Sequence, residues 1–241
     1  MKKLFILSGA GLSAESGIQT FSGSDGLWAH HRIEEICSTE GWARHREKTI
    51  AFYNERRAEL ASREPNGAHR LLARLEERHP DRIWNLTQNV DDLLERAGCA
   101  RVIHLHGILT RLRCEGCSVR FPVGYAPQEP GTVCPACGCS RVRPDVVFFG
   151  ESAPNYRFLY KALRESGLFV ALGTSGRVID LPDLARSSAR SLYVNPDRER
   201  YVTHFGDHEK RIDEYFSETI FQPATEAVEE LEMRIEAFFR G

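Results

Sequence analysis

Four cysteines with the spacing of a metal site constrain this chain more than any other feature. Cys114 and Cys117 form one C-x2-C pair, sixteen residues follow, and Cys134 and Cys137 form a second pair. Two such pairs at this separation are typical of a tetrahedral zinc site with four thiolate ligands. Four thiolates leave no open position for water, so the ion is expected to stabilise structure. The catalytic residues must then lie elsewhere.

The composition argues against several classes of protein. The chain has 241 residues, with 32 basic and 34 acidic side chains and a net charge of −2, which predicts neither a nucleic-acid-binding nor a membrane-binding surface. The other three cysteines, Cys37, Cys99 and Cys139, cannot all pair in disulfides, which suits a protein of a reducing compartment. The first apolar run, residues 4–7, is too short for a secretion signal, and no run approaches the ~18 residues of a membrane span. We therefore expect a cytoplasmic protein.

Short apolar runs alternate with helical patterns along the chain. The runs are rich in branched and aromatic residues and are bounded by Gly, Asn, Asp or Pro, as expected for strands buried on both faces. This alternation predicts an α/β fold, a Rossmann-like parallel sheet with helices on both faces. The expected strands are 4–7, 82–87, 101–105, 146–149, 168–172 and 192–194. Examples of the expected helices are 49–62, 67–78, 90–97 and 224–239.

Residues 110–142 depart from this alternation. They are rich in proline and glycine and contain all four cysteines of the two pairs, so a bound metal would supply the cohesion that an apolar core does not. We interpret them as an inserted zinc-binding module. The expected organisation is a discontinuous Rossmann-like domain, 1–30, 63–109 and 143–241, and a small domain that combines this module with a helical segment, 31–62.

Glycine-rich and polar motifs follow the expected strands, at the edge where open α/β sheets bind ligands. Gly9-Ala10-Gly11 either forms a tight turn or lets backbone N–H groups approach a pyrophosphate. The TQNVDD segment at 87–92 supplies either helix caps or polar groups of a site. Residues 173–176 and 195–197 close two later strands as plain turns or as nucleotide contacts.

Two pairs of side chains are candidates for chemistry. His104 and His106 end the third expected strand, and an imidazole with a pKa of ~6.5 is the natural base at neutral pH, although a packing role is equally open. Tyr53 and Arg56 are three residues apart on an expected helix and share a face. They form either an ordinary amphipathic surface or a grip for a carboxylate.

In order and spacing, these motifs resemble those of the sirtuins, the NAD-dependent protein-lysine deacylases. The similarity runs from about residue 5 to the C-terminal helix. The motifs that carry it are the two cysteine pairs, GAGLSAESGIQTF at 9–21, TQNVDDLLERAG at 87–98, HLHG at 104–107, RPDVVFFGE at 143–151, GTSGRV at 173–178 and VNPD at 194–197.

The resemblance implies the reaction and its residues. A lysine acyl group is transferred to the ribose of NAD, which gives nicotinamide, O-acyl-ADP-ribose and free lysine. His106 is the implied general base, and Asn89 and Asp91 complete the implied catalytic set. The implied NAD contacts are Gly9, Ala10, Gly11, Ser13, Gly17, Phe21, Trp28, Gln88, Asn89, Val90, Asp91, Gly173, Thr174, Ser175, Asn195, Pro196, Asp197 and Ala224.

A finer similarity is to the class III branch, which accepts acidic acyl groups. AFYNERR at 51–57 and DGLW at 25–28 carry it. In that branch the positions of Tyr53 and Arg56 bind the carboxylate of succinyl-lysine or malonyl-lysine. The implied partners are acylated lysines of proteins or peptides, paired as an added strand with Val147, Phe148, Phe149, Gly150 and Glu151.

Two positions depart from the family pattern. Ser22 stands where Arg is usual, and Leu94 stands where His is usual. Ser22 favours an alternative in which the same pocket hydrolyses NAD or transfers ADP-ribose to protein. A more remote alternative is a zinc-ribbon binding module without catalysis. The resemblance implies NAD as co-substrate and one structural Zn²⁺.

Overall fold

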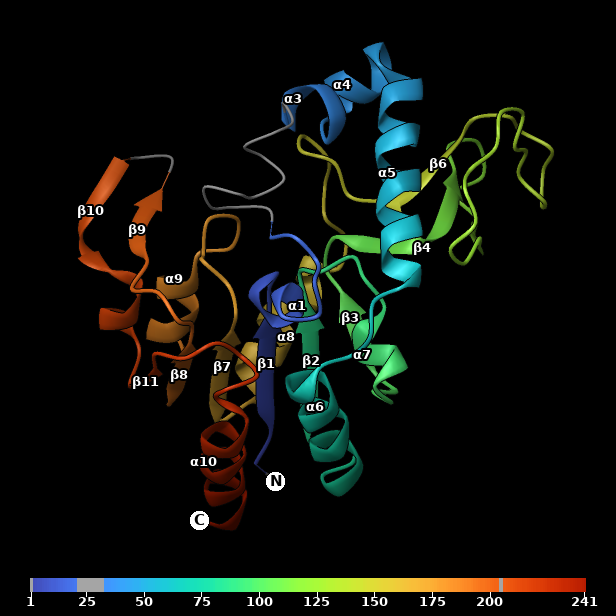
Figure 1. Ribbon diagram of the computed structural model, residues 1–241. Helices are drawn as coiled ribbons and strands as arrows, with labels where there is room; N and C mark the ends of the chain where they lie inside the picture. The colour runs from blue at the N-terminus through green and yellow to red at the C-terminus, as the bar shows by residue number, and fades with distance from the viewer. Residues whose placement is uncertain (1, 21–32, 204–205) are drawn as a thin grey trace.

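A six-stranded parallel sheet forms the centre of the molecule. The computed structural model describes residues 2–20, 33–203 and 206–241 (Figure 1). The strand order is β11-β8-β7-β1-β2-β3, and every neighbouring pair is parallel. The α/β prediction is therefore confirmed. The strands are β1 (Leu4–Ser8), β2 (Ile83–Thr87), β3 (Val102–His104), β7 (Leu168–Leu172), β8 (Ser191–Val194) and β11 (Glu218–Ile220).

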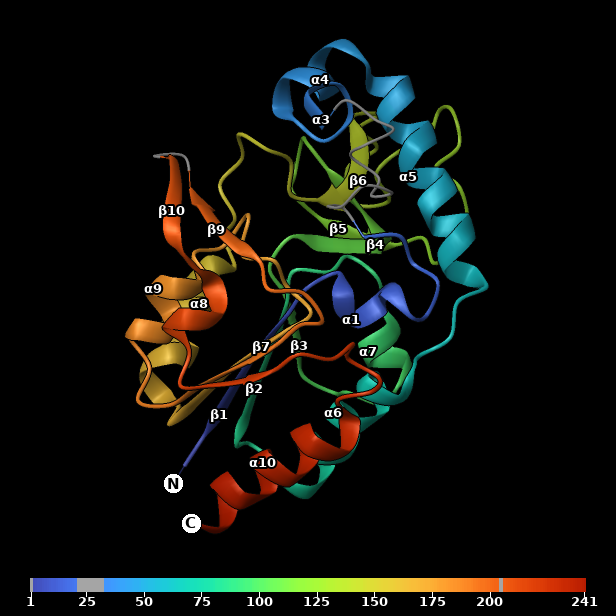
Figure 2. The ribbon, with the colours of Figure 1, turned by 60° about the vertical axis from the view of Figure 1, so that its left-hand side comes forward.

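Both faces of the sheet are covered by helices, which explains why its strands are apolar throughout. Alternate residues of β1 enter different cores: Leu4 and Ile6 pack with α6 (Gly67–Arg78) and α10 (Val228–Arg240), while Phe5 and Leu7 pack with α8 (Tyr156–Glu165) and α9 (Leu181–Arg186). Figure 2 shows these two helix pairs on opposite sides of the sheet. In the part of the chain that the structure describes, no helix combines the length and apolarity of a membrane span.

A smaller unit lies beyond the carboxyl ends of the parallel strands (Figures 1 and 2). It combines three helices with a three-stranded antiparallel sheet of order β5-β4-β6. Arg57 joins the helices of this unit to its sheet: the side chain is fully buried, and its guanidinium donates to the carbonyls of Leu109 and Ala126. The elements are α3 (Ile33–Ile36), α4 (Thr39–Arg44), α5 (Arg46–Ala61), β4 (Gly107–Cys114), β5 (Arg120–Pro122) and β6 (Val142–Val146).

Several details of the sequence-based assignment were wrong. The last helix, α10, starts at Val228 and not at residue 224, and the antiparallel pair of β9 (Arg200–Thr203) and β10 (Gly206–Arg211) was not expected. The run 146–149 is not a strand of the parallel sheet: β6 ends at Val146 and pairs antiparallel with β4. The helix expected at 90–97 is only α7 (Leu93–Arg96), because the Asp91 carboxylate accepts from the Leu93 N–H and starts it late. β11 was not anticipated, since Glu-Thr-Ile is too short and too polar to show a strand pattern.

Two glycine-rich turns interlock where the strand order reverses. The chain continues from β1 to β2 on one side, whereas β7 lies on the other side of β1. After these strands, the N–H of Gly11 donates to the carbonyl of Gly173 at 2.8 Å. Gly173 has φ +61°, and a Cβ there would lie 2.5 Å from the Leu12 nitrogen. The glycines therefore permit backbone-to-backbone contact at the point where doubly wound sheets open a ligand crevice.

We predict that Gly173→Ala destabilises the protein more than Gly131→Ala. Both glycines have positive φ, but a Cβ at Gly131 meets nothing within 4 Å. The control should lose about 1–2 kcal/mol from backbone strain alone, and Gly173→Ala about 3–4 kcal/mol because overpacking adds to it. The free energy of unfolding in denaturant measures both. Equal losses would show that the close approach of the turns carries no energetic weight.

Candidate active site

A cavity of about 820 Å³ opens between the carboxyl edge of the parallel sheet and the small unit. The turns after β1, β2, β7 and β8 form one wall, and Cys37, Tyr53 and the segment after β6 form the other. The predicted site residues that line it are Gly9, Ala10, Gly11, Tyr53, Gln88, Asn89, Val90, His106, Val147, Phe148, Phe149, Gly150, Glu151, Gly173, Thr174, Ser175, Asn195, Pro196 and Asp197.

The other predicted residues lie outside this cavity. Ser13, Asp91 and Arg56 line an adjoining pocket of about 50 Å³. Gly17 packs against the Arg63 guanidinium, and Ala224 is buried in the core that contains α10. Phe21 and Trp28, like Ser22, fall outside the described residues.

His106 is held as a neutral base. Its Nδ1 lies 3.0 Å from the carbonyl oxygen of Gln88, and its Nε2 lies 2.8 Å from the hydroxyl of Tyr156. Because a carbonyl only accepts, Nδ1 carries the proton and Nε2 presents a lone pair. Burial lowers the pKa of His106, and the hydrogen bond to Gln88 opposes this only in part. The imidazole is therefore unprotonated at neutral pH.

Asn89 is fixed by a buried network centred on Ser13. Its Nδ2 donates to the Gly9 carbonyl and to Ser13 Oγ, both at 3.1 Å. Ser13 in turn donates to Asp91 Oδ2 at 2.9 Å. His69 completes the network: Nδ1 accepts from the Asn66 N–H, so the proton is on Nε2, which faces Ser13 Oγ at 3.3 Å.

Burial shifts the pKa values of two groups in this network, His69 and Asp91. It lowers the pKa of His69 to about 4, so this imidazole stays neutral. It raises the pKa of Asp91, although the Leu93 N–H and the Ser13 hydroxyl oppose the shift. Sequence reasoning missed His69, whose only signal is its place three residues after Asn66, the N-cap of α6.

The two histidines of the HLHG motif have different environments. The Nε2 of His104 lies 2.7 Å from the Glu95 carboxylate, and His104 is not among the residues that line the cavity. Burial would lower the pKa of His104, but the Glu95 carboxylate, the Asn89 carbonyl and the charge of Asp91 together outweigh burial, and the pKa is raised. Of the two, only His106 presents an uncharged acceptor to the cavity.

Tyr53 and Arg56 share the smaller pocket, and of the two only Tyr53 also lines the large cavity. Tyr53 lines both, and its hydroxyl donates to the Cys37 thiol at 3.4 Å. Burial is the main reason that the pKa of Tyr53 is raised, so the phenol stays protonated. Arg56 lines only the smaller pocket, where its guanidinium pairs with Glu59 at 2.8 Å. The motifs did not indicate Cys37, whose thiol already accepts the hydrogen bond of the Tyr53 hydroxyl.

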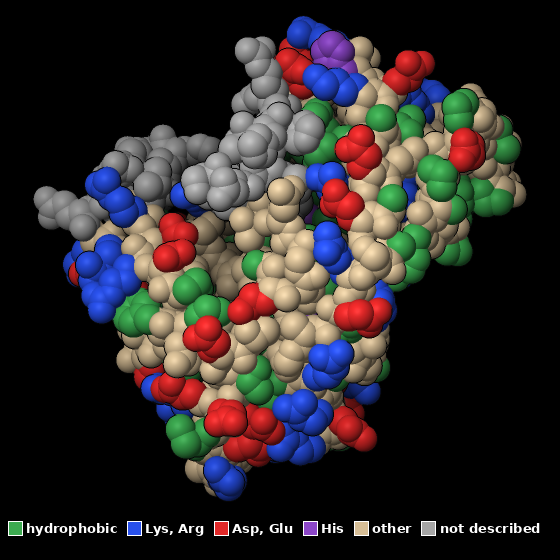
Figure 3. Space-filling view, viewed as in Figure 1, with side chains coloured by type: hydrophobic (Ala, Val, Ile, Leu, Met, Phe, Trp, Pro, Cys, Tyr) green, Lys and Arg blue, Asp and Glu red, His purple; other side chains and the backbone are tan. Residues whose placement is uncertain are grey.

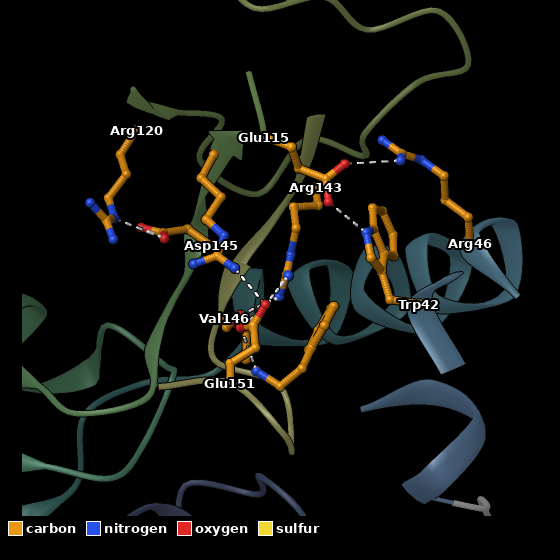
Figure 4. Close-up of polar contacts among 10 residues, drawn as sticks. Trp42, Arg46, Glu115, Arg120, Arg143, Asp145, Val146 and Glu151 are labelled. Carbon is orange, nitrogen blue, oxygen red and sulfur yellow. Dashed lines mark hydrogen bonds and ion pairs between the residues drawn. The ribbon is translucent and has the colours of Figure 1, made fainter. Parts of the chain in front are cut away.

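The segment after β6 is anchored through Glu151 (Figure 4). The carboxylate of Glu151 binds Arg143 and Arg113 at 2.5 and 2.8 Å and accepts from the Phe148 N–H. The Arg143 guanidinium also lies 3.6 Å from the centre of the Phe148 ring. Glu151 therefore shapes this wall through internal ion pairs, while Phe149 is exposed beside it.

The four paired cysteines gather as the spacing predicts. Their sulfur atoms lie within 4.8 Å of one another, with Cys114 to Cys137 at 3.7 Å and Cys117 to Cys134 at 3.6 Å. A tetrahedral ion with Zn–S bonds of ~2.3 Å requires sulfur atoms about 3.8 Å apart. The cluster therefore fits one zinc ion. A search of the described residues for groups of His, Cys, Asp or Glu that could hold a metal ion finds these four cysteines.

Comparisons with known proteins agree with this architecture. A model of the Sir2 family matches residues 9–180. The chain is 38% identical over 240 residues to an NAD-dependent protein deacylase of Campylobacter jejuni, covering 100% of this chain and 98% of the relative. It is 40% identical to one of Caulobacter vibrioides, covering 94% and 93%. A solved Sir2 homologue in complex with ADP-ribose superposes with TM-score 0.85 at 34% identity, covering 99% of this chain and 94% of that one.

We predict that Cys117→Ser abolishes zinc binding and that Cys139→Ser does not. Cys139 is a fifth cysteine beside the cluster, but it is not among the four that gather. Metal analysis of the purified protein should give one zinc per chain for the wild type and Cys139→Ser. Cys117→Ser should also unfold at lower denaturant concentration because the ion's binding energy is lost. Loss of zinc from both variants would contradict the four-thiolate assignment.

Proposed function

This chain belongs to the Sir2 family, and on that premise we propose that it is an NAD-dependent protein deacylase that removes succinyl, malonyl and acetyl groups from lysine side chains. The relatives named above support the deacylase activity. One observation carries the proposal: a neutral base, His106, and a fixed amide, Asn89, face the same cavity beside interlocked glycine turns.

The cavity walls suit the parts of a dinucleotide. The glycine-rich turns at 9–11 and 173–175 line the cavity and carry little side chain, so a diphosphate can approach their backbone closely. The N–H groups of Gly9, Gly11 and Gly173 already donate to carbonyls of the protein. Residues 195–197 lie farther along the sheet edge, where the adenosine half would bind. Asn89 and His106 lie toward the small unit, where the nicotinamide ribose would meet an acyl-lysine.

The proposed chemistry needs one base and one orienting amide. NAD would supply the ADP-ribosyl group: the acyl oxygen of the modified lysine would bond to C1′ of its ribose as the bond from C1′ to nicotinamide breaks. His106 Nε2 accepts the proton of a ribose hydroxyl, which becomes the nucleophile toward the acyl carbon. Asn89 orients the ribose, with Asp91 and Ser13 holding its side chain from behind. Water then completes release of lysine.

Tyr53 and Arg56 support the acidic-acyl preference. Both residues belong to α5 and line the smaller pocket, which shares Ala10, Tyr53, Asn89 and Val90 with the large cavity. A succinyl carboxylate would compete with Glu59 for the guanidinium of Arg56, and Glu59 is half exposed, so the existing ion pair is weak.

The direct test incubates zinc-loaded protein with succinyl-lysine and acetyl-lysine peptides, with and without NAD. We expect NAD-dependent loss of both acyl groups, matched by release of nicotinamide. Nicotinamide release at the same rate without peptide would favour NAD hydrolysis instead. If folded, zinc-loaded protein removes neither acyl group, the proposal is wrong.

Replacing the base should separate chemistry from binding. His106→Gln keeps an N–H that can donate to the Gln88 carbonyl but removes the basic nitrogen. We expect kcat to fall by about 10²- to 10⁴-fold. Calorimetry with ADP-ribose should show little change in affinity. An equal loss of affinity would assign His106 a structural role.

Arg56→Met should discriminate between acyl groups. Only the succinyl group has a carboxylate to leave unpaired, so kcat/KM for the succinyl peptide should fall about tenfold or more, while that for the acetyl peptide changes little. Glu55→Gln is the matched control, because Glu55 is 66% exposed and lies 3.7 Å from the same guanidinium. Equal losses on both peptides with Arg56→Met would mean that Arg56 supports only the fold.

A further inference from the structure

The lone pair of the proposed base already has a partner in the protein. The hydroxyl of Tyr156 lies 2.8 Å from His106 Nε2, and the two ring centres are 5.8 Å apart. Since Nδ1 carries the proton, Nε2 is the acceptor and the phenol is the donor. In the proposed reaction His106 Nε2 must take a proton from the sugar, and in this structure it already accepts a hydrogen bond from Tyr156.

Tyr156 is placed for this contact by its position in the fold. It is the first residue of α8, and its N–H donates to the Ala153 carbonyl at 3.1 Å. The preceding residue, Asn155, donates from its side chain to the His104 carbonyl at 2.7 Å, which ties the start of α8 to the end of β3, two residues before His106. Tyr156 also lines the large cavity, so its ring has room to turn aside.

We propose that Tyr156 is a positioning residue for His106: its phenol holds Nε2 toward the cavity in the free enzyme and yields this place to a sugar hydroxyl when the co-substrate binds. The kinetic consequences of this inference rest on the proposed function, whereas the contact itself does not. Burial raises the pKa of Tyr156, so the phenol remains a donor across the neutral range.

The contact has a definite effect on protonation. A hydrogen bond donated to Nε2 exists only while the imidazole is neutral, so it favours the neutral form and lowers the pKa of His106. The cavity wall also carries the titratable groups Glu15, Cys37, Tyr53, Glu151, Arg177, Asp197 and Glu199. In the described parts of the chain, the hydrogen-bond partners of the His106 ring are Gln88 and Tyr156, and no ion pair joins it.

The test compares Tyr156→Phe with Tyr160→Phe, which removes a phenol hydroxyl four residues along the same helix. Tyr160 is 52% exposed and does not line the cavity. NMR titration of the His106 ring in the free protein should show a pKa higher by about half to one unit in Tyr156→Phe. Tyr160→Phe should match the wild type.

The kinetics then test displacement by the sugar. The acid limb of kcat/KM for NAD reports the free enzyme, and that of kcat reports the complex. Tyr156→Phe should move the first limb to higher pH and leave the second in place.

An unchanged His106 pKa in Tyr156→Phe would overturn the proposal, as would a fall in kcat with neither limb displaced. A protein without deacylase activity but with the NMR shift would refute the proposed function and retain the Tyr156 contact.

Discussion

The site depends on the contact between two backbone turns. Gly9–Gly11 and Gly173 pack without side chains between them, and the N–H of Gly11 bonds the Gly173 carbonyl. The two turns meet at the carboxyl edge of the sheet, and the large cavity lies directly beyond them. The strands on either side then deliver Asn89 and Asn195 to the same cavity from opposite directions. A parallel sheet with this strand order makes such an opening geometrically necessary.

Around this opening, Asn89 and the side chains behind it already have hydrogen-bond partners in the protein. Ser13 joins Asn89 to Asp91 and His69, so the amide is oriented from the buried side. The zinc-binding module is tied to the helices of the small unit. Glu115 lies between two cysteine ligands and accepts from the Trp42 indole at 2.8 Å, which links the metal cluster to α4 (Figure 4). On the face shown in Figure 3, acidic and basic side chains are interspersed, in keeping with the balanced composition.

Residue spacing predicted the features that neighbouring residues determine by themselves. The cysteine pairs, the glycine turns and the apolar strands could be assigned because each has a periodic or pairwise signature. Contacts between distant segments have no such signature. Tyr156 meets His106 across fifty residues, and His69 meets Ser13 across fifty-six. The run at 146–149 was misplaced because its apolar character reflects packing in the small unit, which composition does not distinguish from burial in the main sheet.

A crystal structure of the protein with ADP-ribose tests the central claim most directly. We expect the diphosphate against the turns at 9–11 and 173–175, the adenosine beside 195–197, and the free ribose within hydrogen-bonding distance of Asn89 and His106 Nε2. A ligand bound elsewhere, or one whose ribose points away from His106, would contradict the account.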